Sequence, residues 1–331
     1  MMAMELSFIV YSLAWGSALA LMAGGLAIYY SVSRIANFAH GEFASIGVIT
    51  YLLLVAALHS FANCKGYDIV YCASLSPDNL WMLALVFAAG GLVSLATFVA
   101  VFWPLSRRGA TPLQLMVASI GVMMVIRFLL YIVAGLFQWL SLPSPGAAEY
   151  VVAGFRIDLA ELLSIVLAVA ALVLIALFTS KTMLGISLRA VADNPTLAEA
   201  AGINSFRVQA IAWFIGGGLA ALGGVLMFIL TGPPGERPIV ELGWMNLLSI
   251  FAAAVLGGLG SFYGTLAASI LLGLAYNEAA AWISSSLGLD SSLALSVPFA
   301  LTLLVLLFFP EGLAGIDWYR LIRLVWRIGR R

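Results

Sequence analysis

Long apolar stretches recur along this chain from residue 6 to residue 309, and they restrict its fold more than any other feature. A helix that crosses the roughly 30 Å hydrocarbon core of a bilayer needs about 20 apolar residues. Nine stretches approach that length: Leu6–Tyr30, Phe43–Leu58, Leu80–Trp103, Leu113–Phe137, Leu159–Phe178, Val208–Leu230, Trp244–Leu256, Thr265–Trp282 and Leu293–Phe309. The seventh is short and flanked by glycine, so about eight to ten spans fit the pattern. The sequence therefore predicts an all-α polytopic membrane protein, formed as a single transmembrane domain over residues 1–331.

Charge is too sparse to cover a surface in water. Charged residues make up 9% of the chain and apolar residues 63%, whereas soluble domains carry about 25% charged residues. Lipid must therefore solvate most of the surface. The two cysteines and two histidines leave little material for a metal cluster or for Cys/His catalysis. We expect neither an enzyme nor a metal site, and the formal net charge of zero gives no reason to expect a nucleic-acid partner.

Basic residues divide the connections between the spans into two sets. The richer set holds Arg34, Arg107, Arg108, Lys181, Arg189, Arg207 and the arginines of the C-terminal tail, and the poorer set holds Lys65, Arg156 and Arg237. Positive charge marks the cytoplasmic side of a membrane protein. With nine spans the richer set falls on one side together with the tail. This parity predicts an N-terminus outside and a C-terminus in the cytoplasm.

Two segments outside the spans allow more than one interpretation. Cys64 and Cys72 lie in the predicted outer loop between the second and third spans, where a disulfide is permitted. A bridge and two free thiols both remain open. Residues 316–331 place apolar side chains at helical intervals with arginines between them. That spacing predicts an amphipathic basic tail on the inner leaflet, with a solvated tail as the alternative.

Two charged residues fall inside predicted spans. Arg127 lies a little past the middle of the fourth span, and Glu278 lies about two-thirds along the eighth. An unpaired charge at that depth costs at least a few kcal/mol. We expect both side chains to face the interior of the bundle, at similar depth, where they can pair with each other. Snorkelling of Arg127 to the headgroups is the alternative.

Small residues form stripes in the later spans. Gly216, Ala220 and Gly224 recur at intervals of four, a pattern that lets helix backbones approach closely. The run GGLGSFYG at 257–264 follows an apolar helix rather than a strand and has one residue too many for the dinucleotide fingerprint. We interpret it as a break between two spans. The chain contains no P-loop, so an ATP-driven process needs another chain to hydrolyse ATP.

The stretch SRIANFAHGEF, residues 33–43, gathers polar side chains between two apolar runs. As a tight cytoplasmic turn, Asn37 would cap a helix, Gly41 would relieve the backbone and Glu42 would sit in the first turn of the next helix. The apolar residues between them favour a different interpretation. Irregular backbone at membrane depth has to line protein or water, so we favour a break buried within the bundle, with His40 facing a path.

The longest inner connection, residues 181–207, predicts a short capped helix. Asn194 is an N-cap candidate, Pro195 suits the first turn and Gly202 suits a left-handed C-cap. Such a helix can dock in a cleft on a soluble partner, or it can pack on the underside of the bundle. The residues alone favour neither.

Three stretches carry a resemblance to a known family. Residues 189–226, RAVADNPTLAEAAGINSFRVQAIAWFIGGGLAALGGVL, resemble the coupling-loop region of permeases from ATP-binding-cassette importers. The stretches RIANFAHGEFASIGVI and GGLGSFYGTLAASILLGL resemble the branched-chain amino acid permeases, in particular the smaller LivH-type subunit. The resemblance runs from the first predicted span to the eighth, in the order of the family.

The resemblance implies an importer in the cytoplasmic membrane that moves branched-chain amino acids by alternating access. Its implied partners are a second, homologous permease of the LivM type, two cytoplasmic ATPases that hold ATP and magnesium, and an outer solute-binding protein. This chain would bind no cofactor itself. Residues expected to contact the ATPase are Arg189, Asp193, Asn194, Glu199, Ala200, Ala201, Gly202 and Arg207. Candidates for the translocation path or gate are Asn37, His40, Gly41, Glu42 and Asn246.

Two alternatives stay open. An ion-coupled secondary transporter could use Glu42, His40 and Glu278 as a proton or sodium site. A member of the same permease family could instead carry urea, short amides or other amino acids.

Overall fold

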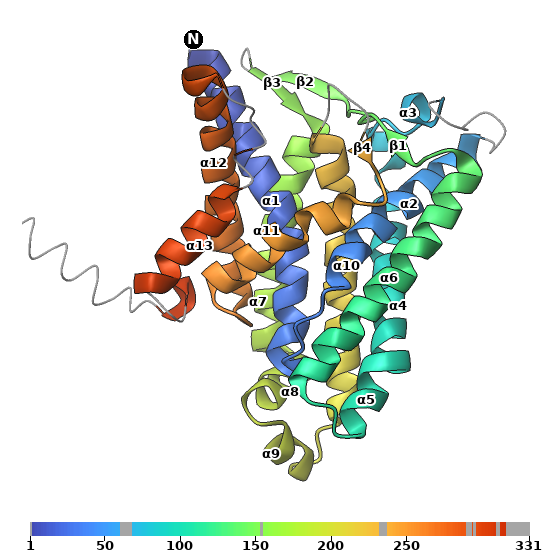
Figure 1. The fold of residues 1–331 in the computed structure, drawn as a ribbon, viewed down its shortest axis with the longest axis vertical. Coiled ribbons are helices and arrows are strands. Elements are labelled where there is room, and N and C mark those ends of the chain that lie inside the picture. Colours follow the sequence, from blue (N-terminus) through green and yellow to red (C-terminus); the bar gives the residue numbers. More distant parts are fainter. Residues whose placement is uncertain are drawn as a thin grey trace, which may run out of the picture.

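The computed structural model describes residues 2–59, 68–152, 155–231, 237–288, 293, 296–308 and 312–315. Most of them are helical, and short strands lie at one end of the bundle (Figure 1). The long helices are α1 (Met2–Ser33), α2 (His40–His59), α4 (Met82–Thr97), α6 (Pro112–Phe137), α7 (Leu159–Lys181), α10 (Ser205–Leu230) and α12 (Phe262–Leu287). The shorter helices are α3 (Asp68–Cys72), α5 (Trp103–Arg107), α8 (Met183–Asp193), α9 (Pro195–Ala200), α11 (Leu242–Gly257) and α13 (Val297–Phe308). A π-helical turn, Phe98–Phe102, joins α4 to α5.

Seven of the described helices are long and apolar enough to cross a membrane: Ser7–Ser33, His40–Leu58, Met82–Arg107, Pro112–Phe137, Leu159–Lys181, Ser205–Leu230 and Phe262–Ser286. The other two predicted spans correspond to α11 and α13, which have 16 and 12 residues. At 1.5 Å per residue these helices are only about 24 and 18 Å long, less than the roughly 30 Å core. The fold is therefore that of an all-α polytopic membrane protein.

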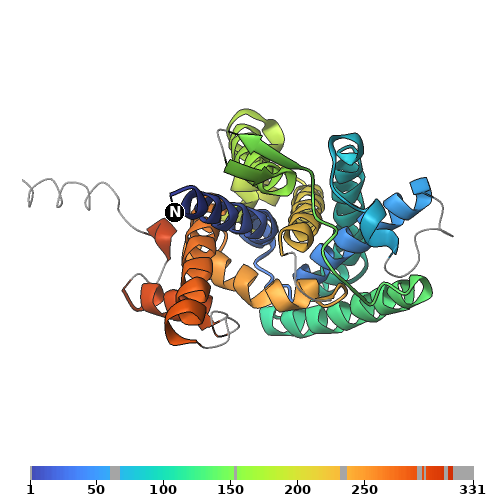
Figure 2. The same cartoon turned by 90° about the horizontal axis from the view of Figure 1, so that it is seen from above.

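Helices α1 and α10 form the centre of the bundle. Seen from above, α12 and α13 lie to one side of this pair, and α2, α4 and α6 lie to the other (Figure 2). Helix α10 packs against α1, α2 and α4, and α1 packs against α10, α12 and α7. Most of α1 and α10 is buried, whereas only a minor part of α6 and α7 is buried. The last two helices therefore face lipid or another subunit.

The two ends of the bundle differ in structure and charge. One end carries the antiparallel strand pairs β1 (Ser141–Leu142) with β4 (Arg237–Pro238) and β2 (Glu149–Val152) with β3 (Phe155–Asp158) (Figure 1). The other end carries α5, α8 and α9, and with them the inner loops predicted from basic residues. For the described residues, the sequence-based division of the loops into two sets matches this division of the structure.

Local chemistry accounts for the limits of several helices. At the start of α6 the Thr111 hydroxyl accepts a hydrogen bond from the Gln114 amide, and the Gln114 side chain accepts one from the Thr111 amide. This reciprocal arrangement is a capping box. The helix ends where Gln138 takes a left-handed φ of 61°. At the other end of the bundle, Asn204 caps α10 by accepting from the Arg207 amide at 3.0 Å.

Close approach of helix backbones depends on glycine at two crossings. A Cβ atom built on Gly216 of α10 would meet the backbone of Gly25 of α1, and the reverse also holds. At the second crossing, Gly41 of α2 faces Gly243 of α11 in the same way. The predicted stripe of Gly216, Ala220 and Gly224 is thus a packing feature. It contacts two helices, because Gly216 lies against α1 and Gly224 lies against Ala44 of α2.

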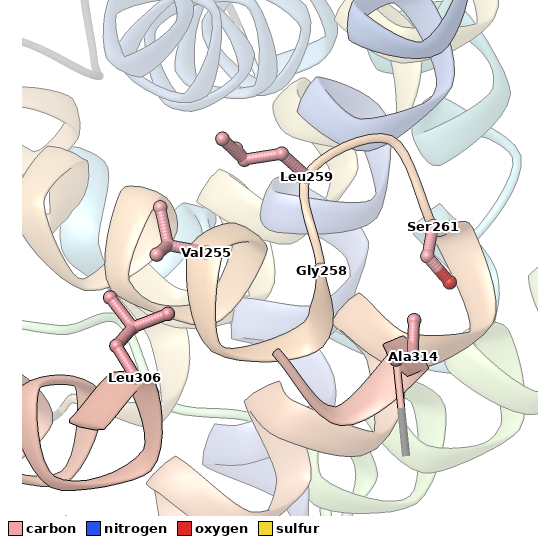
Figure 3. Close-up of a pocket in the computed structure, with 7 residues that line it drawn as sticks. Val255, Gly258, Leu259, Ser261, Leu306 and Ala314 are labelled. Atoms are coloured by element: carbon pink, nitrogen blue, oxygen red, sulfur yellow. The ribbon is translucent and has the colours of Figure 1, made fainter. Parts of the chain in front are cut away.

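The glycine-rich run 257–264 is the turn between α11 and α12. Gly258 and Gly260 have positive φ angles, and the Ser261 hydroxyl caps α12 by accepting from the Gly264 amide. A cavity of about 370 Å³ lies beside this turn, lined largely by apolar side chains such as Val255 and Leu306 (Figure 3). Its one side-chain hydroxyl is already used by the cap, so the interpretation as a break between two helices holds.

Two predictions fall on residues outside the described part of the chain. The amphipathic tail at 316–331 lies wholly outside it. Cys64 also lies outside it, so the pairing of Cys64 with Cys72 stays a prediction.

Replacing Gly216 with alanine should separate α1 from α10, because the added methyl group meets the Gly25 carbonyl. We expect the free energy of unfolding to fall by about 1 to 3 kcal/mol, measured as a lower thermal unfolding midpoint in nanodiscs. Gly121→Ala on α6 is the matched control, since nothing lies within 4 Å of a Cβ there. Equal midpoints for the two variants would contradict this account of the crossing.

Candidate functional site

The segment between α1 and α2 runs back into the bundle instead of turning at its end. Helix α1 ends at Ser33 and α2 begins at His40, whose Nε2 donates to the Met22 carbonyl oxygen at 2.8 Å. Met22 lies eleven residues before the end of α1, which corresponds to about 16 Å along the helix axis. Residues 34–39, called here the break, therefore climb from the α8–α9 end toward the middle of the membrane.

Burial of the break agrees with the interpretation favoured from its apolar residues. Within the break Asn37 is 0% exposed, and in the first turn of α2 His40 is 0% exposed and Glu42 is 1% exposed. Its freed backbone groups find protein partners: the Ala39 amide donates to Asn37 Oδ1, and the Phe38 amide donates to Ser119 Oγ of α6, both at 2.9 Å. Asn37 thus forms a local turn just before α2, inside the bundle, and does not make the predicted cap, which would accept from an amide of the first helical turn.

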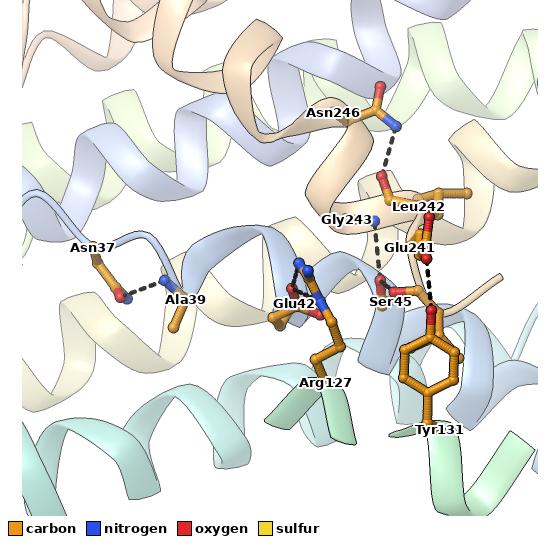
Figure 4. A network of polar contacts seen from close by, with 11 residues as sticks. Asn37, Ala39, Glu42, Ser45, Arg127, Tyr131, Glu241, Leu242, Gly243 and Asn246 are labelled. Atoms are coloured by element: carbon orange, nitrogen blue, oxygen red, sulfur yellow. Dashed lines mark hydrogen bonds and ion pairs between the residues drawn. The ribbon is translucent and has the colours of Figure 1, made fainter. Parts of the chain in front are cut away.

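Glu42 forms a buried ion pair with Arg127 of α6 (Figure 4). Arg127 Nε and Nη2 both donate to Glu42 Oε1, at 3.1 and 2.5 Å. The guanidinium carbon also lies 4.8 Å from the centre of the Trp244 ring on α11. The Arg127 side chain is 13% exposed and the Glu42 side chain is 1% exposed. Both groups are therefore largely shielded from water and lipid.

The expected pairing of Arg127 with Glu278 is wrong. Glu278 lies on an exposed position of α12 rather than in the bundle interior, and Arg127 is held by Glu42. The reason is that α2 begins inside the bundle, which brings Glu42 to the depth of Arg127. Snorkelling is also excluded for Arg127 in this structure, since its guanidinium points to α2 (Figure 4).

The start of α11 is hydrogen-bonded to both α2 and α6 beside this ion pair. The Ser45 hydroxyl, one turn after Glu42, donates to the Val240 carbonyl and accepts from the Gly243 amide, each at 2.9 Å. Between them, Glu241 Oε1 accepts from the Tyr131 hydroxyl at 2.6 Å. Sequence analysis missed Ser45, Tyr131 and Glu241, although Tyr131 follows Arg127 by four residues and so shares its helix face.

The other predicted path residues lie around the same region. Gly41 provides the close contact of α2 with Gly243. Asn246 is half-buried, and its amide donates to the Leu242 carbonyl of its own helix at 2.9 Å (Figure 4). Of the predicted path residues, Glu42 thus contacts Arg127 and Gly41 contacts α11, whereas His40 faces Met22 of α1.

An aromatic column connects the break to the π-helical turn of α4. The Tyr29 ring lies 5.4 Å from His40 and stacks on Trp213 at 4.4 Å. Trp213 in turn contacts Phe98 at 5.4 Å and Phe102 at 4.8 Å. Such π-helical turns are frequent at functional sites. Two buried polar atoms beside the column, His40 Nδ1 and Trp213 Nε1, have no hydrogen-bond partner among the described residues.

The predicted short helix is present as α9, at the far end of the bundle. Asn194 Oδ1 accepts from the Leu197 amide at 3.0 Å, Pro195 occupies the first turn and Gly202 has a φ of 86°. The predicted contact residues are all exposed: Arg189, Asp193, Asn194, Glu199, Ala200, Ala201, Gly202 and Arg207. A further helix, α8, precedes it, and its Ala192 carbonyl accepts a hydrogen bond from Arg34 Nη2 at 3.4 Å.

The strand end of the bundle carries a small group of carboxylates. Glu149 of β2 lies 3.9 Å from Arg156 of β3, and both side chains are largely exposed. Burial, followed by repulsion from Glu161 and Glu149, raises the pKa of Asp158 to about 6. Among the described residues, no three His, Cys, Asp or Glu side chains gather in a way that could hold a metal ion.

Removing Arg127 should leave Glu42 as an unpaired buried charge. We expect Arg127→Met to lower the free energy of unfolding by about 3 to 5 kcal/mol, measured by SDS titration of the purified protein in mixed micelles. Adding Glu42→Gln should restore part of the loss, because the orphaned charge is gone. If the loss in free energy of unfolding in the double variant equals the sum of the losses in the two single variants, the two residues do not interact.

Comparison with known proteins gives one consistent result. Residues 8–307 match the family described as "Branched-chain amino acid transport system / permease component". The chain is 30% identical over 326 residues to the probable branched-chain amino acid transport permease protein LivH of Methanocaldococcus jannaschii, covering 96% of this chain and 93% of that protein.

Two bacterial relatives are similar over the same length. The high-affinity branched-chain amino acid transport system permease protein LivH of Escherichia coli is 30% identical over 311 residues, 91% of this chain and 92% of that protein. BraD of Pseudomonas aeruginosa, which carries the same description, is 30% identical over 321 residues, 93% of this chain and 94% of that protein. The chain therefore belongs to the branched-chain amino acid permease family and is a multi-pass transport subunit of the cytoplasmic membrane.

Proposed function

We propose that this chain imports branched-chain amino acids as one permease subunit of an ATP-driven complex. The observation that carries this proposal is the family match over residues 8–307, together with the names of relatives that align with almost the whole chain. ATP and magnesium belong to partner ATPases, and this chain contributes no cofactor. Urea, short amides and other amino acids stay as alternative cargoes.

The proposed orientation places α8 and α9 in the cytoplasm and the strand end outside. The exposed basic residues Arg107, Arg108 and Lys181 lie at the α8–α9 end, as the positive-inside rule requires. The N-terminus of α1 lies at the strand end (Figure 1), which supports an N-terminus outside. We retain nine membrane segments, with α11 and α13 as partial ones.

The proposed partners fit three surfaces of the chain. The exposed side of α9 suits a cleft in an ATPase subunit, because Leu197 is 68% exposed there at the predicted cytoplasmic end. The strand end suits a solute-binding protein outside. The apolar faces of α6 and α7, of which only 22% and 17% are buried, offer a surface for lipid and for a second, homologous permease.

The proposed mechanism is alternating access, in which movement of α8 and α9 reaches the break. Arg34 links the break to the Ala192 carbonyl of α8, and the aromatic column links His40 to Trp213 of α10. The break contains backbone groups that depend on side-chain partners such as Asn37 and Ser119. Exchange of those partners would change access to Glu42 and Arg127 without unfolding a helix.

Uptake of radiolabelled leucine tests the proposal. Proteoliposomes should contain this chain, its second permease and the ATPases, with the solute-binding protein outside and ATP inside. We expect leucine uptake that requires ATP and all of these components. Uptake by this chain alone, driven by an ion gradient, would establish the secondary-transporter alternative. ATP-dependent uptake of urea or acetamide but not leucine would change the cargo.

Replacing Leu197 with aspartate should disrupt contact with the ATPase while leaving the fold intact, because the side chain is exposed. We expect leucine uptake and copurification of the ATPase to fall by at least about tenfold, as for a hot-spot contact. Val151→Asp on β2 is the matched control for copurification of the ATPase, since Val151 is 73% exposed at the opposite end, where no ATPase contact is proposed. Normal copurification of the ATPase with Leu197→Asp would remove α9 from the interface.

A further inference from the structure

Three ionisable side chains lie where α2, α6 and the start of α11 come together, and two of the three are carboxyl groups. The charge cluster consists of Glu42, Arg127 and Glu241, which contribute two carboxylates and one guanidinium (Figure 4). Arg127 directs both of its described hydrogen bonds to one oxygen of Glu42. Glu241 is held by the neutral hydroxyl of Tyr131. The cluster thus contains two carboxyl groups for one guanidinium.

One carboxylate oxygen of the cluster has unused bonding capacity. Glu42 Oε2 is buried and has no hydrogen-bond partner among the described residues, and the whole side chain is only 1% exposed. A buried carboxylate oxygen without a donor costs free energy, and an uncompensated charge at membrane depth costs more. A cation that carries its own N–H donors would give this oxygen a hydrogen bond and would pair with the second carboxyl group.

The cluster lies next to a face of the chain that is open and apolar. On α11, Trp244 is 44% exposed and lies against the Arg127 guanidinium, and the next residue, Met245, is 60% exposed. On α6 the neighbouring face is apolar as well, with Phe128 62% exposed. A small molecule that reaches the cluster along this face therefore meets carboxylates at its ammonium end and apolar side chains around the rest. The Trp244 ring also offers its face to a cation.

We propose that the charge cluster binds the α-ammonium group of the transported amino acid, with Glu42 Oε2 and the Glu241 carboxylate as acceptors. This proposal rests on the proposed function, because it takes an amino acid as the cargo. It adds a site within the permease itself and a basis for discrimination. Urea and neutral amides lack the positive charge that the cluster needs, so the site favours amino acids over them.

Two analogues that share the branched side chain separate the two ends of the substrate. Isopentylamine carries only the ammonium group and 4-methylpentanoate carries only the carboxylate. The measurement is the thermal unfolding midpoint of the permease–ATPase complex in nanodiscs, without solute-binding protein. We expect leucine and isopentylamine to raise the midpoint in a saturable way and 4-methylpentanoate to leave it unchanged. Equal stabilisation by the two analogues, or none by leucine, would overturn the proposal.

Glu241→Gln removes one of the two carboxyl groups and keeps an oxygen that can accept from Tyr131. We expect isopentylamine to bind this variant at least about tenfold more weakly, which is the size expected for a hydrogen bond to a charged group. Glu278→Gln is the matched control, since it removes an exposed carboxylate from α12, and its affinity should stay within about threefold of wild type. Wild-type affinity in Glu241→Gln would overturn the proposal, and the analogue comparison decides the matter if that variant does not assemble.

Two further measurements distinguish the ammonium site from a metal-cation site and from failure of the proposed function. Replacing potassium with sodium at constant ionic strength should leave the midpoint unchanged; a rise equal to that with leucine would assign the cluster to a metal cation instead. ATP-driven leucine uptake is measured on the same preparation. Uptake without stabilisation by isopentylamine would overturn the ammonium site alone, whereas absence of leucine uptake would overturn the proposed function.

Discussion

A backbone that leaves its helix inside a membrane has to find every hydrogen-bond partner within the protein, and the centre of this molecule is organised around that requirement. The break between α1 and α2 meets it with Asn37 on its own segment and Ser119 on α6. Those contacts fix where α2 begins. Because α2 begins deep in the bundle, Glu42 reaches Arg127, and Ser45 reaches the first turn of α11. The position of three helices thus follows from one irregular segment.

Glycine makes this arrangement sterically possible. The crossing of Gly41 with Gly243 brings α2 and α11 into backbone contact directly beside the ion pair. A side chain at either position would push α11 away and move Trp244 off the guanidinium. In a membrane, where association of helices depends on packing and hydrogen bonds rather than on the hydrophobic effect, close backbone contact and the polar contacts around Ser45 support each other.

Features set by residues next to one another were predicted correctly from the sequence, whereas contacts that depend on depth within the bundle were not. The long apolar runs, the Asn194 and Pro195 start of α9 and the left-handed Gly202 follow from residues next to one another, and the structure contains them. The pairing of Arg127 with Glu278 was predicted from their fractional positions along two spans. The break was predicted to be buried, but its depth was not, so Glu42 was not placed near Arg127. The true partner, Glu42, lies 85 residues away in sequence. Glu241 and Tyr131 could not be joined in advance, since α11 had to be placed first.

The break is also the segment best placed to absorb relative movement of the two ends. On one side, Arg34 attaches it to α8, with a φ of 55° that few residues other than glycine adopt. On the other side, the ion pair of Glu42 with Arg127 attaches the start of α2 to the middle of α6. If α8 moves with a docked partner while α6 stays with the bundle, residues 34–39 have to change conformation, because the flanking helices are held by continuous hydrogen bonds. Any such change alters the support of Glu42, which is how an event at the predicted cytoplasmic end would reach the charge cluster at mid-membrane.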